Sequence, residues 1–183
     1  MTIADANLKA LAAFAETAAE YCRFIDSLWA GRPERLYSTL EALLLKVHAG
    51  ILPVQMEMAE EKHPEHGALA MTHEQWRDIA DIINVSVCAE IQDVAGWHRS
   101  LNTDEAVARL NEYCAGRAEM LWDDLADIYR DLHCGLALWS VSTSDSQAEA
   151  AWEWRWRYEH HWGEHLFRAM LTTHEIRYQF CKE

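Results

Sequence analysis

Three aspartates in the second half of the chain are spaced so that they could bind a cation from one edge of a helix. Asp124, Asp127 and Asp131 recur at intervals of three and four residues, which places them along one edge of an α-helix, beside its apolar stripe. Three carboxylates on one edge could hold a divalent cation through oxygen ligands. The alternative is that these aspartates are solvated, or that they pair with Arg155 and Arg157 of the helix that follows.

Two histidines near the C-terminus have the spacing of a transition-metal site. His161 and His165 are four residues apart and share a helix face, where two imidazole rings could bind one metal ion. His48, in the middle of an earlier predicted helix, could supply a third nitrogen. Such a site would leave a position open for a water molecule that the metal activates. The alternative is that both rings pack among the aromatic residues of segment 154–162.

The composition limits the classes of binding partner and the cellular compartment that we expect. The chain carries 30 acidic and 16 basic residues, a formal charge of −14. It has no basic stripe that would bind phosphates, so we expect no nucleic-acid partner. No apolar run approaches the roughly 20 residues that span a bilayer, and the N-terminus lacks a signal-peptide pattern. With five cysteines and no Cys-x-x-Cys pair, a cytoplasmic protein with reduced thiols and no membrane contact is expected.

Long helices are predicted to position these side chains. Glycine and proline number only seven and three, and apolar residues recur at three- and four-residue spacing through most of the chain. The first predicted helices cover about 8–29 and 36–51; Gly50 and Pro53 interrupt the second with a kink or a break, and a short helix follows to about Glu61. Further helices are predicted over 72–94 after the capping box Thr72-x-x-Gln75, over 103–139, and from 144 to at least 172 after the box Ser144-x-x-Gln147. Segment 103–139 is either one helix or two that meet near Gly116. We expect one all-α domain over residues 1–183, an antiparallel bundle of about five to six helices.

The last predicted helix has two packing faces. Counting about 100° per residue places Trp152, Trp156 and Gly163 on the face that closes on the core. The other face, toward the aspartate helix, carries Trp154, Tyr158, His161, Trp162 and His165. A glycine in a packed helix costs about 1 kcal/mol against alanine, which the close approach of a second helix at Gly163 would offset.

Two segments of the C-terminal half carry a longer pattern. The first runs Asp-Leu-Ala-Asp-Ile-Tyr-Arg-Asp-Leu over 124–132 and Gly-Leu-Ala-Leu over 135–138; the second is Trp-Glu-Trp-Arg over 152–155 and His-Trp-Gly-x-His over 161–165. Over about 120–174 the chain thereby resembles a bacterial, all-helical family known only as domain of unknown function 5063. The resemblance implies a compact helical domain and no particular reaction. The candidate binding residues within it are Asp124, Asp127, Tyr129, Asp131 and Trp162.

His48, His161 and His165 also follow a second pattern, one histidine on the second helix and a His-x-x-x-His pair on the last. In this respect the chain is similar to the DinB-like metal-binding four-helix bundles. The string Glu-His-His-x-Gly-Glu over 159–164 adds to the likeness, although those proteins lack the Asp-Ile-Tyr-Arg-Asp-Leu stretch. This resemblance implies a divalent metal on the three histidines.

The sequence leaves the function between two classes, and enzyme activity stays open. Because no complete catalytic constellation is found and tryptophan is abundant, at nine residues, the first expectation is a non-catalytic helical module. It would bind a protein partner or serve a bacterial cytosolic assembly, without a cofactor. The alternative is a metal-dependent enzyme that uses His48, His161 and His165; a Mg²⁺-dependent nucleotide hydrolase that uses the acidic edge is a third. Substrate, partner identity and oligomeric state do not follow from the sequence.

Overall fold

The computed structural model describes residues 3–56, 70–99 and 104–180, with side chains over 6–56, 70–87, 116 and 120–178. These residues form helices and turns and include no strand, which confirms the expected all-α fold. In chain order the elements are α1 (Ile3–Ser27), the 3₁₀ turn η1 (Leu28–Ala30), α2 (Leu36–Ile51), α3 (His73–Arg99), α4 (Asp104–Ser140), α5 (Ser144–Arg157), the π turn η3 (Tyr158–Trp162), α6 (Gly163–Glu175) and the π turn η4 (Ile176–Phe180).

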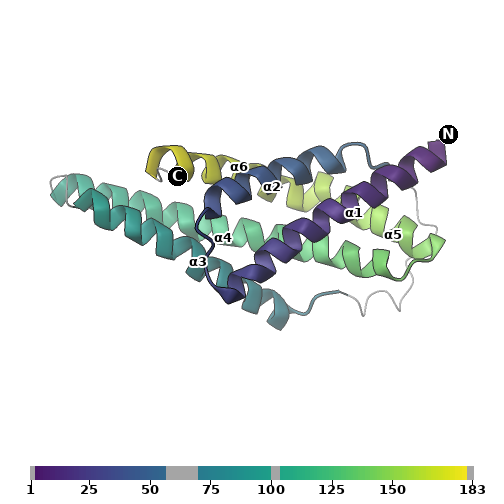
Figure 1. The fold of residues 1–183 in the computed structure, drawn as a ribbon, viewed down its shortest axis with the longest axis horizontal. Helices are drawn as coiled ribbons and strands as arrows, with labels where there is room; N and C mark the ends of the chain where they lie inside the picture. Colours follow the sequence, from purple (N-terminus) through teal and green to yellow (C-terminus); the bar gives the residue numbers. More distant parts are fainter. Residues whose placement is uncertain (1–2, 57–69, 100–103, 181–183) are drawn as a thin grey trace.

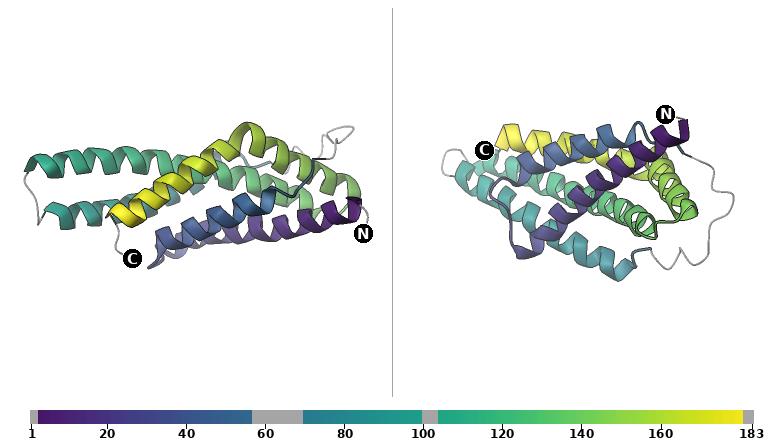
Figure 2. Two further views of the ribbon diagram at one scale, coloured as in Figure 1. Left: turned by 90° about the horizontal axis from the view of Figure 1, so that it is seen from above. Right: turned by 45° about the vertical axis from the view of Figure 1, so that its right-hand side comes forward.

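The helices form a bundle in which α4 is the central element, packed against α1, α3, α5 and α6. α3 and α4 run side by side and project beyond the other helices at one end (Figure 1). α5, η3, α6 and η4 follow one another as a bent rod that runs back along α4, while α1 and α2 form a hairpin that packs on α4 and α6 (Figure 2). None of the described helices is both long and apolar enough to cross a membrane. This arrangement lays the last quarter of the chain on the helix that carries the three aspartates.

Local capping signals set the starts of two helices. At the start of α3, the Thr72 amide donates to the Gln75 side chain at 2.9 Å and the Gln75 amide donates to the Thr72 hydroxyl at 3.2 Å. This is the predicted capping box. α5 begins at Ser144, but its cap is Thr143, whose hydroxyl accepts from the Ser146 amide. The box predicted at this helix start was therefore wrong by one residue.

Two predicted interruptions had different outcomes. α2 ends at Ile51, two residues before Pro53, since a proline can neither donate to the helical hydrogen-bond ladder nor fit within it. Residues 52–56 are turn and coil, and the rest of the short helix predicted to about Glu61 lies outside the described residues. α4 runs unbroken past Gly116, so this segment is one helix.

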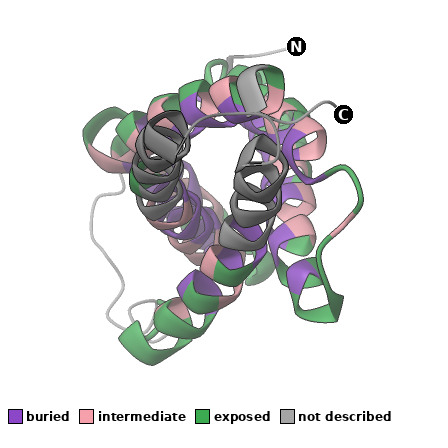
Figure 3. Cartoon of the chain, turned by 90° about the vertical axis from the view of Figure 1, so that its left-hand side faces the viewer, coloured by how far each residue is buried: buried purple, intermediate pink, exposed green. Residues whose placement is uncertain are grey.

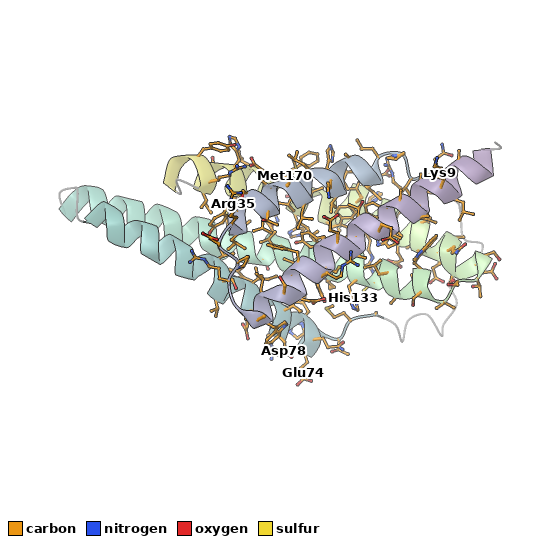
Figure 4. All side chains as sticks on the ribbon, in the orientation of Figure 1. Lys9, Arg35, Glu74, Asp78, His133 and Met170 are labelled. Atoms are coloured by element: carbon orange, nitrogen blue, oxygen red, sulfur yellow. The ribbon has the colours of Figure 1, made fainter. Side chains whose placement is uncertain are left out.

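The core lies along the bundle, and the helices turn their buried sides toward it (Figure 3). Its centre is aromatic: the Phe14 ring lies edge-on to Trp154 at 5.1 Å and stacks with Trp162 at 6.3 Å. Tyr21 is fully buried and donates its hydroxyl hydrogen to the Leu125 carbonyl at 2.9 Å, which ties α1 to α4. Side chains fill the space between the helices (Figure 4).

The π turn η3 changes which residues of the last helices face the core. Buried residues recur at four-residue steps: Ser146, Ala150, Trp154, then Trp162 and Leu166. In an uninterrupted α-helix each four-residue step drifts by about 40°, so the stripe would turn by about 200° over this length. The wider π turn inserts one extra residue, which removes about 100° of that drift. The π turn therefore keeps the apolar stripe on the core.

For this reason the predicted faces of the last helix were wrong in part. Trp154 and Trp162 are both fully buried in the core. Trp156, which was expected to close on the core, is 38% exposed, and its ring stacks on that of Trp152 at 5.2 Å. Counting at a constant angle per residue cannot detect the extra residue of a π turn.

Gly163 is required by the π turn itself and not by a neighbouring helix. A Cβ at this position would lie 2.1 Å from the Tyr158 carbonyl oxygen, five residues earlier in the same helix. Close approach of a second helix occurs instead at Gly135, where a Cβ would lie 2.0 Å from Trp154 Nε1. The predicted reason for Gly163 was therefore wrong.

Candidate functional site

The three aspartates on the predicted edge of α4 lie together and are buried. Asp124, Asp127 and Asp131 have 1, 9 and 0% of their surface exposed, and all three contact side chains of η3 or α6. Carboxylates this deeply buried require hydrogen-bonding or charged partners, because leaving water costs an ion several kcal/mol. These partners include His161 and His165.

Two of the aspartates orient the two histidines. His161 Nδ1 lies 2.7 Å from Asp131 Oδ2, and His165 Nδ1 lies 2.8 Å from Asp124 Oδ1. An ionised carboxylate only accepts hydrogen bonds, so each Nδ1 carries a proton and donates it. Both rings are thereby held in orientation, and each Nε2 is left as the nitrogen that can bind a metal ion.

The third aspartate lies between the two Nε2 atoms. Asp127 Oδ2 is 3.3 Å from His165 Nε2 and 3.8 Å from His161 Nε2. One ligand atom from each of these residues lies within 4.8 Å of the other two, so small adjustments would let them share a metal ion at bond lengths of about 2.0–2.2 Å. We call Asp127, His161 and His165 the Asp127 site. Asp127 Oδ1 is buried and accepts no hydrogen bond from the described residues.

Each buried aspartate also has an arginine within 3.1 Å: Arg157 at Asp131, Arg168 at Asp124 and Arg130 at Asp127. The pairing with Arg157 that the sequence offered as an alternative is thus present. Arg155 instead donates to Glu159 at 2.8 Å. The cluster is therefore a layered network, in which buried carboxylates lie between imidazole and guanidinium groups.

Charge and burial shift the pKa values of His165 and Asp123 at this cluster. The hydrogen bond to Asp124 raises the pKa of His165; burial opposes the shift, and the charge of Asp127 adds to it. Burial and the charge of Asp127 raise the pKa of Asp123, which lies beside the cluster. The carboxylates of Asp124 and Asp127 thus favour the protonated form of His165.

Asp123, Asp124 and His165 form a second set of ligand atoms that overlaps the first. In this second set, Asp124 already accepts hydrogen bonds from His165 and from two nitrogens of Arg168. The guanidinium would have to leave before a metal ion could take these oxygens. At the Asp127 site, no arginine has to leave Asp127 Oδ2 before a metal ion binds. This site is therefore the better candidate for a metal site.

His48 lies outside this cluster, so the predicted three-histidine site is not assembled. Its Nδ1 is 3.0 Å from the Tyr158 hydroxyl oxygen, and its ring packs against Phe167 with centroids 5.0 Å apart. His48 belongs to neither set of potential metal ligands in the described part of the chain. The reason is the direction of the helix faces, because Tyr158 turns toward α2 whereas His161 turns toward α4.

The two aromatic residues predicted to bind a ligand lie away from the cluster. Tyr129 is two residues from Asp127, which in a helix is nearly the opposite side. Its hydroxyl donates to Asp26 of α1 at 2.7 Å. Trp162 is fully buried and donates its indole N–H to the Trp154 carbonyl at 3.1 Å. Both side chains stabilise the packing of the bundle.

Two residues of the network, Arg130 and Arg168, were not among the site residues predicted from the sequence. Arg130 follows Asp127 by three residues and Arg168 follows His165 by three, the spacing of neighbours on a helix surface. This signal was present in the sequence. It is weak, because oppositely charged residues at such spacing are common on solvated helices.

Comparisons with known proteins find a domain model that covers the segment with the cluster. Residues 99–179 match the family model described as Domain of unknown function (DUF5063), and this segment contains the whole Asp127 site. The crystal structure of protein BF1032 from Bacteroides fragilis is similar over 93% of each chain, with a TM-score of 0.70 at 17% sequence identity, which shows a common fold. No curated protein matches this chain. Residues 99–179 therefore carry a match to the DUF5063 domain.

Proposed function

We propose that this protein binds one divalent transition-metal ion at the Asp127 site and acts as a metal-dependent enzyme in the bacterial cytoplasm. A single observation carries the proposal. Asp131 and Asp124 each hold one imidazole by Nδ1, and both Nε2 atoms lie within 3.8 Å of the same oxygen of Asp127. Metal-binding histidines commonly donate their second ring nitrogen to a carboxylate in this way.

The donor set indicates the kind of metal and of chemistry. Two imidazoles and one carboxylate suit Zn²⁺ and Fe²⁺, and sites with three protein ligands keep at least one position for water or substrate. A metal ion in such a site lowers the pKa of its bound water and so generates hydroxide near neutral pH. The side chains of Asp124 and Asp131 would keep both imidazoles in the tautomer that binds metal.

Metal titration of the purified protein tests this proposal. Co²⁺ is added to protein freed of metal, and the visible absorption of the bound ion reports its coordination. His161→Ala, His165→Ala and Asp127→Asn should each abolish this absorption. His160→Ala is the matched control, because the neighbouring His160 stacks on Trp156 at 4.5 Å and contributes to neither set of ligands. His48→Ala should also bind Co²⁺ normally; loss of binding there would favour a three-histidine site.

A protein-interaction module remains a second candidate, and exposed apolar side chains favour it. Five large apolar residues along α2, α6 and their ends have half or more of their surface exposed: Leu45, Leu52, Phe167, Leu171 and Tyr178. We call these residues the α2/α6 surface. Exposed patches of this kind often bind protein partners, and a second copy of the chain is the simplest partner.

Sedimentation velocity tests the second candidate. The wild-type protein should associate as its concentration rises, and the double variant Phe167→Gln/Leu171→Gln should stay monomeric. Both residues are more than half exposed, so the substitutions should leave the fold intact. A wild-type protein that sediments as a monomer at every concentration would count against self-association through this surface.

A further inference from the structure

The three arginines of the cluster differ in how firmly they are held. Arg157 donates to Asp131 at 2.9 Å and also to Glu153. Arg168 donates to Asp124 at 2.7 Å and to Glu164 at 2.7 Å. Such charge-assisted bonds are the strong ones in proteins.

Arg130 has weaker contacts. Its Nη1 is 3.1 Å from Asp127 Oδ1 without the direction of a hydrogen bond, and its Nε is 3.6 Å from Asp131 Oδ1, which is too long for one. Its hydrogen bond to the cluster runs from Nη2 to His161 Nε2, at 3.5 Å. That nitrogen is a ligand atom of the Asp127 site, so Arg130 is bonded to the lone pair that a metal ion would take.

Arg130 also lies on the open side of the Asp127 site. The side chains of Arg130 and His161 are 31 and 35% exposed, whereas those of Asp127 and His165 are 13 and 14% exposed. We therefore take the surface at Arg130 and His161 as the entrance by which a molecule from solvent would reach the metal. A metal ion bound at His161 Nε2 would remove the hydrogen-bond acceptor of Nη2 and leave that donor without a partner at the entrance.

The charges at this entrance favour an anion. Asp127 is the one carboxylate in the ligand set, so a divalent ion would keep a positive charge after binding to it. Asp124 and Asp131 are already paired with Arg168 and Arg157. The metal ion and Arg130 would together present two positive centres side by side, a match for a group with two or more anionic oxygens.

We infer that Arg130 binds the substrate of the proposed metal site, and that this substrate carries an oxyanion, a phosphate or a carboxylate group. One oxygen would bind the metal and a second would accept hydrogen bonds from the guanidinium. This inference rests on the proposed metal function and adds the chemical class of the substrate. It assigns Arg130 a role in binding that Arg157 and Arg168, which hold the carboxylates of the histidine pairs, do not share.

Anion titrations of the Co²⁺-loaded protein test the inference. Sodium phosphate and sodium acetate are added separately, and the change in cobalt absorption gives the affinity for each anion. The variant is Arg130→Gln. The matched control is Arg155→Gln, since Arg155 of α5 pairs with Glu159 and with carbonyls at the end of α2 and does not contact the cluster. Circular dichroism checks that both variants are folded.

We expect at least one of the two anions to change the wild-type spectrum, and the tighter one identifies the group. Arg130→Gln should bind that anion about tenfold more weakly or worse, with Co²⁺ affinity unchanged, because a charged hydrogen bond is lost. Arg155→Gln should match the wild type. Equal anion affinity in Arg130→Gln, loss of Co²⁺ from this variant, or a wild-type spectrum that neither anion changes would each overturn the inference. A wild-type protein that binds no Co²⁺ would instead reject the metal function itself.

Discussion

The indole ring of Trp154 lies so close to Gly135 that no side chain fits between them. A Cβ on Gly135 would be 2.0 Å from Trp154 Nε1, and the indole N–H donates to the Leu132 carbonyl at 3.1 Å. This contact joins α4 to α5 directly beside the aspartate and histidine cluster. It also explains why a glycine and a tryptophan stand in the two segments on which the family resemblance rests.

Adding a methyl group at Gly135 should therefore destabilise the protein. We expect Gly135→Ala to lower the free energy of unfolding by about 2 kcal/mol or more, because the methyl group overpacks a fully buried ring. Urea unfolding measures the effect. Gly116→Ala is the control in the same helix: a Cβ there meets nothing within 4 Å, so this variant should be stabilised by up to about 1 kcal/mol. Similar effects of both substitutions on the free energy of unfolding would contradict the close contact between Gly135 and Trp154.

Substitution at Gly163 should disrupt the π turn. The Cβ of Gly163→Ala would collide with the Tyr158 carbonyl oxygen, 2.1 Å away, and a backbone atom cannot move aside as a side chain can. We expect a loss of about 1–3 kcal/mol in the free energy of unfolding. Co²⁺ affinity should fall as well, because His161 lies within the turn. An unfolding curve and a cobalt titration that both match the wild type would show that the turn tolerates a side chain.

Removing the charge of Asp131 should weaken the metal site without removing a ligand. Asp131 is fully buried and accepts from His161 and Arg157. We expect Asp131→Asn to lower Co²⁺ affinity about 10- to 100-fold, since carboxylates that orient metal-binding histidines have effects of this size. Glu164→Gln is the control: its carboxylate is 78% exposed and bonds only Arg168 among the contacts seen here. Cobalt titration of both variants compares them, and equal affinities would argue against the orienting role.

The stability of the C-terminal segment should depend on pH through Glu41. Burial alone would raise the pKa of Glu41, but hydrogen bonds from His174 and Arg177 outweigh it and lower the pKa below 4.5. A lowered carboxyl pKa adds stability above the unfolded value, and this stability is lost as the pH falls through the folded value. The wild type should therefore be more stable than Glu41→Gln at pH 7, and the difference should vanish in acid. Urea unfolding at a series of pH values measures this difference; a constant difference down to about pH 2 would contradict the assignment.

Much of the fold could be predicted because its signals are local. Helical periodicity, the capping box at Thr72 and the helix end before Pro53 each depend on a few neighbouring residues. The aspartate edge was visible for the same reason, because three residues within one helix fix their own relative directions. The four-residue spacing of His161 and His165 likewise placed both rings on one face, and the structure brings them to 4.9 Å between ring centroids.

What the sequence could not show is how the helices are turned toward one another. A π turn at Tyr158–Trp162 shifts the residues before it by one position relative to those after it. Trp154, and not Trp156, therefore lies in line with Leu166 in the core. From the sequence, His48 was as good a candidate ligand as the other two histidines. In the structure, α2 is turned so that His48 contacts Tyr158 instead. Asp127 takes its place beside His161 and His165.

The sequence by itself thus determined the helices, the segment that resembles a known family, and the pair His161 and His165, which share one helix face. Only the tertiary structure decided that the carboxylate of Asp127, and not His48, lies beside the two imidazoles, and that Arg130 contacts His161. The physical reason is that spacing along a chain specifies directions within one helix, whereas contacts between helices depend on the rotation of each about its axis. Here one inserted residue and two glycines, Gly135 and Gly163, set that rotation through packing.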